Sequence, residues 1–139
     1  VSLDASFMEG SNLNAGAIAG SQYIKNPISA AISVMNDSPH VLLSSEGADE
    51  FAIKMGLDTM PNSYFITERR LNSVRKAKEN DKLAVVDPFI NDYKYGTVGC
   101  VAIDKYGNIS SGTSTGGTTN KKWGRIGGCS HYRSRNLCK

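Results

Sequence analysis

The chain has 139 residues, of which 40% are hydrophobic, and this is enough for a single domain with a hydrophobic core. The formal net charge is +3, and the three C-terminal basic residues Arg133, Arg135 and Lys139 account for all of it. The basic character therefore belongs to the C-terminal end and argues against a nucleic-acid-binding face. No apolar run is long enough for a transmembrane helix, so we expect no membrane partner.

The three cysteines exclude a disulfide framework. Cys100 lies in the body of the chain, whereas Cys129 and Cys138 lie near its end, and no spacing resembles a metal-ligand pattern. We therefore expect neither a metal nor another cofactor. Val1 already lies in a strand-like pattern without a start signal, so we expect a fragment; the cytoplasm is favoured, and an upstream signal peptide stays open.

The N-terminal part predicts two strands, residues 1–8 and 15–20, separated by a turn at Glu9-Gly10. Because the connection is short, we expect them to pair antiparallel. A helix is predicted to begin at Asn26-Pro27 and to end at Ser38. Its core-facing positions, which recur at helical spacing, are Ile28, Ile32 and Met35.

The middle of the chain predicts a short buried strand over residues 40–43, followed by a helix that Ser45 caps and Gly56 closes. The apolar face of this helix consists of Ala48, Phe51, Ala52 and Met55.

Residues 57–66 are expected to form a loop anchored by Tyr64 and Phe65. A highly charged helix is predicted from Thr67 to about Lys78. From residue 79 to residue 95 the periodicity fails, and we expect a mobile linker.

The stretch from Gly96 to Gly127 is the most informative part of the sequence. An alternating apolar run follows Thr97, turns at residues 105–108 and returns to a turn rich in glycine and threonine, which predicts a buried β-hairpin. A hydroxyl residue after a glycine at the mouth of a strand is where cleavage would create an N-terminal nucleophile. Thr97 is the candidate.

Three motifs in this stretch, GTVGCVAIDKYGN, TSTGG and GRIG, together with LDASFMEG, AGAIAG and IKNPISAAISVM upstream, resemble the plant-type asparaginases and isoaspartyl peptidases. These enzymes are N-terminal nucleophile hydrolases. The resemblance covers residues 1 to 127. Composition and periodicity alone predict a mixed α/β (α+β) chain, and the resemblance implies part of a four-layer αββα sandwich.

The resemblance also implies a division of the chain. Residues 1–95 correspond to the C-terminal part of the α subunit, with the mobile linker 79–95, and residues 96–127 contain the scissile glycine and the start of the β subunit. Family members are usually dimers of cleaved αβ units, so a homo-oligomer is expected for the parent protein.

A threonine hydroxyl is a weak nucleophile that needs a nearby base. Cleavage of the Gly96-Thr97 bond would free the α-amine of Thr97, whose reference pKa of about 7.7 to 8.0 suits that role. Without the resemblance, Thr97 reads as an ordinary strand residue. With the resemblance, Thr115 is the expected hydrogen-bond partner of the Thr97 hydroxyl; without it, a residue of an ST-turn before two glycines is the favoured interpretation.

The resemblance implies that Arg125 binds the substrate α-carboxylate, a role that suits the fork of a guanidinium. An arginine after a glycine is otherwise usually a surface residue. In the family, the position of Gly128 is an aspartate that binds the substrate α-amino group. This departure removes half of the expected amino-acid clamp.

Residues 128–139 match nothing in the family pattern. A one-base shift in a permitted choice of codons converts this segment into DAPIIGAGTYA, which fits the pattern and restores the aspartate. We therefore expect a frameshifted tail beginning near Gly127-Gly128. The alternative is a genuine divergent terminus.

The leading functional hypothesis is a β-aspartyl amide hydrolase that cleaves itself at Gly96-Thr97 and then acts on L-asparagine or isoaspartyl dipeptides. A small amino-acid or dipeptide is therefore the expected partner. A glycosylasparaginase is the nearest rival, although the glycine before Thr97 and the TSTGG spelling favour the asparaginase branch. The third hypothesis is that this chain alone is an inactive fragment or a pseudogene product.

Overall fold

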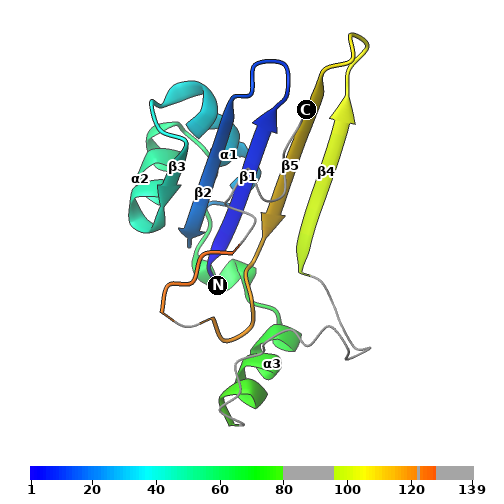
Figure 1. Ribbon diagram of the computed structural model, residues 1–139. Coiled ribbons are helices and arrows are strands. Elements are labelled where there is room, and N and C mark those ends of the chain that lie inside the picture. The colour runs from blue at the N-terminus through cyan, green and yellow to red at the C-terminus, as the bar shows by residue number, and fades with distance from the viewer. Residues whose placement is uncertain (80–95, 122, 128–139) are drawn as a thin grey trace.

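The computed structural model describes residues 1–79, 96–121 and 123–127. Its centre is one sheet with the strand order β3-β2-β1-β5-β4, as Figure 1 shows. The β2-β3 pair is parallel and the other three pairs are antiparallel. The strands are β1 (Leu3–Glu9), β2 (Ala15–Ser21), β3 (Leu42–Ser44), β4 (Thr97–Ile103) and β5 (Ile109–Thr115).

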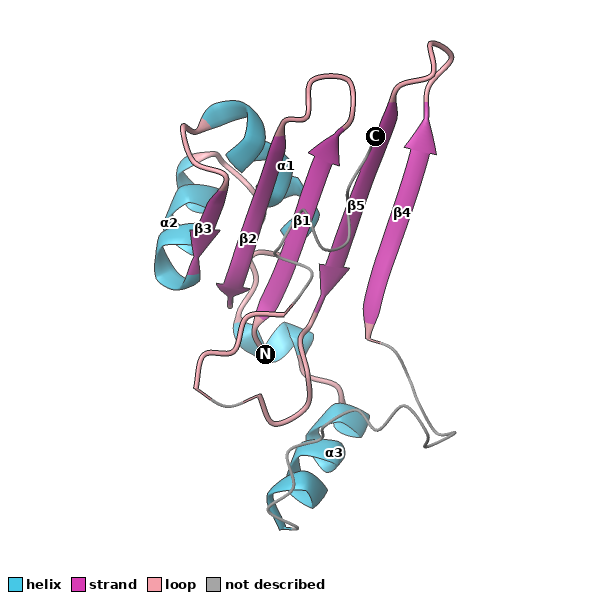
Figure 2. Cartoon of the chain, in the orientation of Figure 1, coloured by secondary structure: helices cyan, strands magenta, loops and turns pink. Residues whose placement is uncertain are grey.

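Two helices, α1 (Pro27–Asp37) and α2 (Ser45–Lys54), pack side by side on one face of the sheet (Figure 2). A third helix, α3 (Glu68–Glu79), lies beyond the end of the sheet at which β4 begins. A single 3₁₀ turn, η1 (Asn62–Phe65), precedes α3. The mixed α/β class is therefore confirmed, and the described residues contribute one helical layer and one sheet layer.

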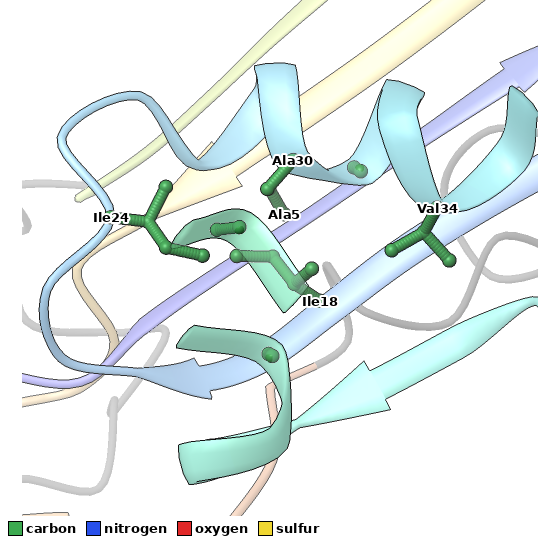
Figure 3. Close-up of a cluster of buried hydrophobic side chains, with 8 residues drawn as sticks. Ala5, Ile18, Ile24, Ala30 and Val34 are labelled. Atoms are coloured by element: carbon green, nitrogen blue, oxygen red, sulfur yellow. The ribbon is translucent and has the colours of Figure 1, made fainter. Parts of the chain in front are cut away.

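The core between the sheet and its helices is built largely from small side chains (Figure 3). Gly16 of β2 shows why: a Cβ atom there would lie 2.1 Å from the Ala31 carbonyl oxygen of α1. The backbones of strand and helix therefore approach too closely for larger residues. The fully buried members of the core are Ala5, Ile18, Ile24, Ala30, Ala31, Val34, Ala48 and Ala52.

The helices and the first two strands lie within a few residues of their predicted positions. The buried stripe of α1 is Ala30, Ala31 and Val34, whereas the predicted Ile28, Ile32 and Met35 are half-buried at its margins. Bulky residues pack beside the contact line because only small ones fit on it. In α2, the predicted Ala48 and Ala52 are buried.

Three local predictions in the middle of the chain were wrong. The strand after α1 is Leu42–Ser44 and is largely exposed, because this short strand forms the edge of the sheet. The residue that precedes α2 is Ser44 instead of Ser45, and its side chain makes no capping hydrogen bond. The loop of residues 57–66 contains η1, and Tyr64, an expected anchor, is 58% exposed.

The prediction of a buried hairpin was wrong for its first strand. β4 is the other edge of the sheet, and from Val98 to Ile103 its residues, including Cys100, are exposed. The helices α1 and α2 cover the opposite half of the sheet (Figure 1). β5 lies between two strands and is largely buried or half-buried.

The turn between β4 and β5 is organised by Asp104. Its carboxylate accepts hydrogen bonds from the Asn108 side chain at 2.9 Å and from the backbone N–H groups of Tyr106 and Asn108 at 2.8 and 2.9 Å. The hydrogen bond from the Asn108 side chain is the main reason that the pKa of Asp104 lies below its ordinary value of 3.8. A turn acid of the DKYGN motif therefore has a structural role.

We predict that Gly16→Ala lowers the free energy of unfolding by roughly 3 kcal/mol, because the new methyl group would push α1 off the sheet. Urea unfolding followed by circular dichroism measures the change. Gly47→Ala in α2 is the matched control, since a Cβ atom there meets nothing within 4 Å. Alanine at this helical position should leave stability equal or slightly higher. Equal losses in both variants would contradict the packing argument.

Candidate active site at the start of β4

The register of the sheet brings Thr97 and Thr115 together. Thr97, the first residue of β4, is the Cα partner of Thr115, the last residue of β5. On its other side, Thr115 is the partner of Asp4 in β1. Asp4, Thr115 and Thr97 thus form one row across three adjacent strands, and Thr97 stands at the edge, where it is only half-buried.

The hydroxyl of Thr115 joins the two residues of the Gly96-Thr97 bond. It accepts a hydrogen bond from the Thr97 hydroxyl at 3.4 Å and donates one to the Gly96 carbonyl oxygen at 3.2 Å. The Gly117 N–H donates to the Thr115 hydroxyl oxygen at 3.2 Å. A buried hydroxyl is thereby aimed at both the candidate nucleophile and the carbonyl that this nucleophile would attack.

The two glycines after Thr115 permit a sharp turn at the end of β5. Gly117 has a φ angle of +78°, a conformation that favours glycine, and a Cβ atom there would lie 3.2 Å from the Ser2 carbonyl oxygen. The ST-turn interpretation of Thr115 is therefore correct as well, because its hydroxyl accepts the Gly117 N–H. The local turn and the contact with Thr97 coexist in one side chain.

Asp4 anchors the loop that follows this turn. Its fully buried carboxylate accepts hydrogen bonds from the N–H groups of Gly20 at 2.8 Å and Gly127 at 3.3 Å. The Lys121 ammonium lies 4.0 Å from the same carboxylate and donates to the Ser2 hydroxyl at 3.1 Å. The buried charge is thus partly neutralised and hydrogen-bonded, as burial of a carboxylate requires.

Asp4 was not among the site residues selected from the sequence. An aspartate at the start of a strand gave no hint that Gly127, far along the chain, would be its partner. The LDASFMEG motif was the available signal, since a carboxylate inside an otherwise apolar strand must find donors when it is buried.

Arg125 lies on the loop that Asp4 anchors. Its guanidinium is exposed and donates to the Thr118 hydroxyl at 3.2 Å, three residues after Thr115. The adjacent Thr119 hydroxyl accepts a hydrogen bond at 3.4 Å from Arg70 of α3, which sequence reasoning did not select. Gly128 and the tail of residues 128–139 lie outside the described residues, as does nearly all of the predicted linker 79–95.

Other candidate chemistry is sparse. In the described ranges no three side chains of the His, Cys, Asp and Glu types gather in a way that would hold a metal ion. None of the described helices is long and apolar enough to span a membrane. His40 is exposed, and Glu9 accepts a hydrogen bond from Asn12 at a surface turn.

Comparison with known proteins agrees with the motifs. The family model described as asparaginase (Asparaginase_2) matches residues 1–132. The isoaspartyl peptidase of Salmonella typhimurium is 43% identical over 128 residues, which are 90% of this chain. The isoaspartyl peptidase/L-asparaginase of Homo sapiens is 42% identical over 91% of the chain, and that of Rattus norvegicus is 39% identical over 99%.

These matches cover 41%, 40% and 42%, respectively, of the relatives' own lengths. The chain thus spans about two fifths of the length of these three relatives. Within that span the family match extends across the sheet, the hairpin and the loop of Arg125. The chain belongs to the asparaginase family.

Proposed function

We propose that this chain contains the cleavage site and the nucleophile of a β-aspartyl amide hydrolase acting on L-asparagine and isoaspartyl dipeptides. The observation that carries the proposal is the Thr115 hydroxyl, which is hydrogen-bonded to both the Thr97 hydroxyl and the Gly96 carbonyl. A hydrogen bond between hydroxyl residues on paired strands is common in a sheet. The additional hydrogen bond from Thr115 to the carbonyl before Thr97 is the contact that self-cleavage at this bond would use.

Self-cleavage would proceed by attack of the Thr97 Oγ1 on the Gly96 carbonyl carbon. The carbonyl oxygen then gains negative charge, which the hydroxyl of Thr115 can stabilise by the hydrogen bond it already donates. Collapse of this tetrahedral intermediate breaks the Gly96-Thr97 C–N bond and leaves an ester between Gly96 and the Thr97 Oγ1. The proton that the hydroxyl lost during attack ends on the new α-amine. Water hydrolyses the ester to a Gly96 carboxylate and a free hydroxyl.

The new α-amine would then be the base for the same hydroxyl. Its reference pKa of about 7.7 to 8.0 leaves a substantial neutral fraction near pH 7.5, and it lies on the same residue as the nucleophile. In turnover, the hydroxyl attacks the β-carbonyl of the substrate, the amine of the leaving group departs, and water releases aspartate. No separate histidine is required.

Arg125 is the proposed ligand of the substrate α-carboxylate, and its exposed guanidinium leaves it accessible. The partner group for the substrate amine is an aspartate in the family, and Gly128 stands there in this chain. We attribute this difference to the proposed frameshift near Gly127-Gly128. The named relatives are isoaspartyl peptidases and asparaginases, which favours this activity over that of a glycosylasparaginase.

Sequencing of the encoding DNA tests the frameshift directly. We expect codons for residues 128–139 that read DAPIIGAGTYA when shifted by one base. Codons that cannot yield this continuation would contradict the proposal. The complete gene product, read from the same DNA, is then the protein for the experiments on cleavage and turnover.

In that protein, Thr97→Ala should abolish both self-cleavage and hydrolysis, because it removes the only atom proposed to attack in both reactions. Intact mass measurement and N-terminal sequencing follow cleavage, and the wild type should yield a chain that begins Thr-Val-Gly-Cys. Release of aspartate from L-asparagine, an isoaspartyl dipeptide and a glycosylated asparagine measures turnover. Thr97→Ser is the matched control and should retain slow cleavage. Turnover by the alanine variant would refute the nucleophile.

Thr115→Val should slow self-cleavage roughly hundredfold, because it removes one preorganised donor to the Gly96 carbonyl while keeping the shape of the side chain. The time course of the intact mass at 25 °C gives the rate. Thr113→Val lies on the same strand two residues away, so it reports the effect of any threonine loss from β5. An equal slowing in both variants would mean that Thr115 acts only by stabilising the sheet.

A further inference from the structure

Arg70 of α3 lies directly against the candidate cleavage site. Its Nη2 atom is 3.0 Å from the position that a Cβ atom would occupy on Gly96, so the guanidinium lies beside that glycine. Its Nη1 atom donates to the Thr119 hydroxyl on the loop after β5 at 3.4 Å. One side chain therefore connects α3, the residue before Thr97 and the loop that carries Arg125.

The position of Arg70 is set by the start of α3. The Thr67 hydroxyl accepts the backbone N–H of Arg70 at 3.4 Å, and the Thr67 carbonyl accepts that of Leu71 at 2.9 Å. The helix α3 lies beyond the end of the sheet where β4 begins (Figure 1). A Cβ atom on residue 96 would crowd the end of the Arg70 side chain, so glycine at this position leaves room for the guanidinium.

The positive charge of Arg70 has no carboxylate partner in the part of the chain that the structure describes. The ion pairs there join Lys25 to Asp58 and Lys121 to Asp4. A guanidinium beside a neutral peptide gains little, but self-cleavage would change the charge of that peptide. The carbonyl oxygen of Gly96 becomes negative during attack, and the finished cleavage leaves a carboxylate on Gly96.

We propose that Arg70 is a positioning residue for self-cleavage: it holds the Gly96 backbone beside the Thr97 hydroxyl and neutralises the negative charge that cleavage places on Gly96. This inference rests on the proposed function, because it assumes that the Gly96-Thr97 bond is broken. It concerns the making of the nucleophile and assigns Arg70 no contact with the substrate.

The test follows self-cleavage of the complete gene product by intact mass over time. Arg70→Gln should cleave roughly tenfold more slowly than the wild type, since a charge-assisted contact at an exposed position is lost. Arg70→Lys should be intermediate, because it retains the charge without the fork. Arg75→Gln is the matched control: it lies on the same helix, and its guanidinium donates to Asn72. It should cleave at the wild-type rate.

A soluble cation separates this role from a structural one. Guanidinium chloride at about 50 mM, far below the concentrations that unfold proteins, should partly restore cleavage in Arg70→Gln, whereas equal sodium chloride should not. The proposal would be overturned, in favour of a structural role for α3, by a particular set of rates. In that case Arg70→Gln cleaves slowly, guanidinium does not restore its rate, and Arg70→Lys cleaves as slowly as Arg70→Gln.

Two further outcomes distinguish the inference from the proposed function. If the wild type cleaves itself and Arg70→Gln does so at the same rate, the role of Arg70 is wrong and the proposed nucleophile stands. If the wild type does not cleave, both are wrong. Circular dichroism of each variant, expected to match the wild type, shows that the rates compare folded proteins.

Discussion

The register of β5 between β1 and β4 is the constraint on which the candidate site depends. It places Thr115 opposite both Asp4 and Thr97. A slip by one residue would turn the Thr115 side chain to the opposite face of the sheet and leave the Gly96 carbonyl without its donor. Buried polar contacts oppose such a slip, because Ser6 of β1 and Thr113 of β5 are also hydrogen-bonded, at 3.0 Å, in the same register.

The same register governs the loop that carries the arginine. Because Thr115 ends β5 beside Asp4, the chain leaves the sheet next to a buried carboxylate. That carboxylate then holds the Gly127 N–H, and Lys121 lies close to it. Arg125 stands between these two attachment points, so its backbone is held at both sides while its guanidinium stays exposed.

Local patterns predicted the elements well and predicted their surroundings poorly. The glycine and proline signals correctly indicated α1, α2 and the β4-β5 turn, since these depend on nearby residues. Burial depends on what covers an element. The apolar residues of β4, such as Val98, Val101 and Ile103, did not reveal that this strand is an exposed edge of the sheet. In α1, alanines instead of isoleucines line the contact, because Gly16 brings the backbones so close.

For the site, motif resemblance selected Thr97, Thr115 and Arg125, and the structure brings the first two into contact. Asp4 and Arg70 were missed as partners because their contacts join segments far apart in the sequence. Asp4 meets Gly127, and Arg70 meets Thr119. No local periodicity encodes such pairs. Asp4 in a buried strand and Gly96 before Thr97 were the available hints that other segments pack closely against these two positions.

The sheet also explains how the proposed cleavage can leave the nucleophile in place. All seven residues of β4 pair with β5, beginning with Thr97 itself. Breaking the bond to Gly96 would therefore remove no ladder partner of Thr97, and the new terminus would still be fixed by its contact with Thr115. Gly96 itself lies outside β4, beside the Thr115 hydroxyl and Arg70. The sheet therefore holds the threonine side of the broken bond in register without depending on Gly96.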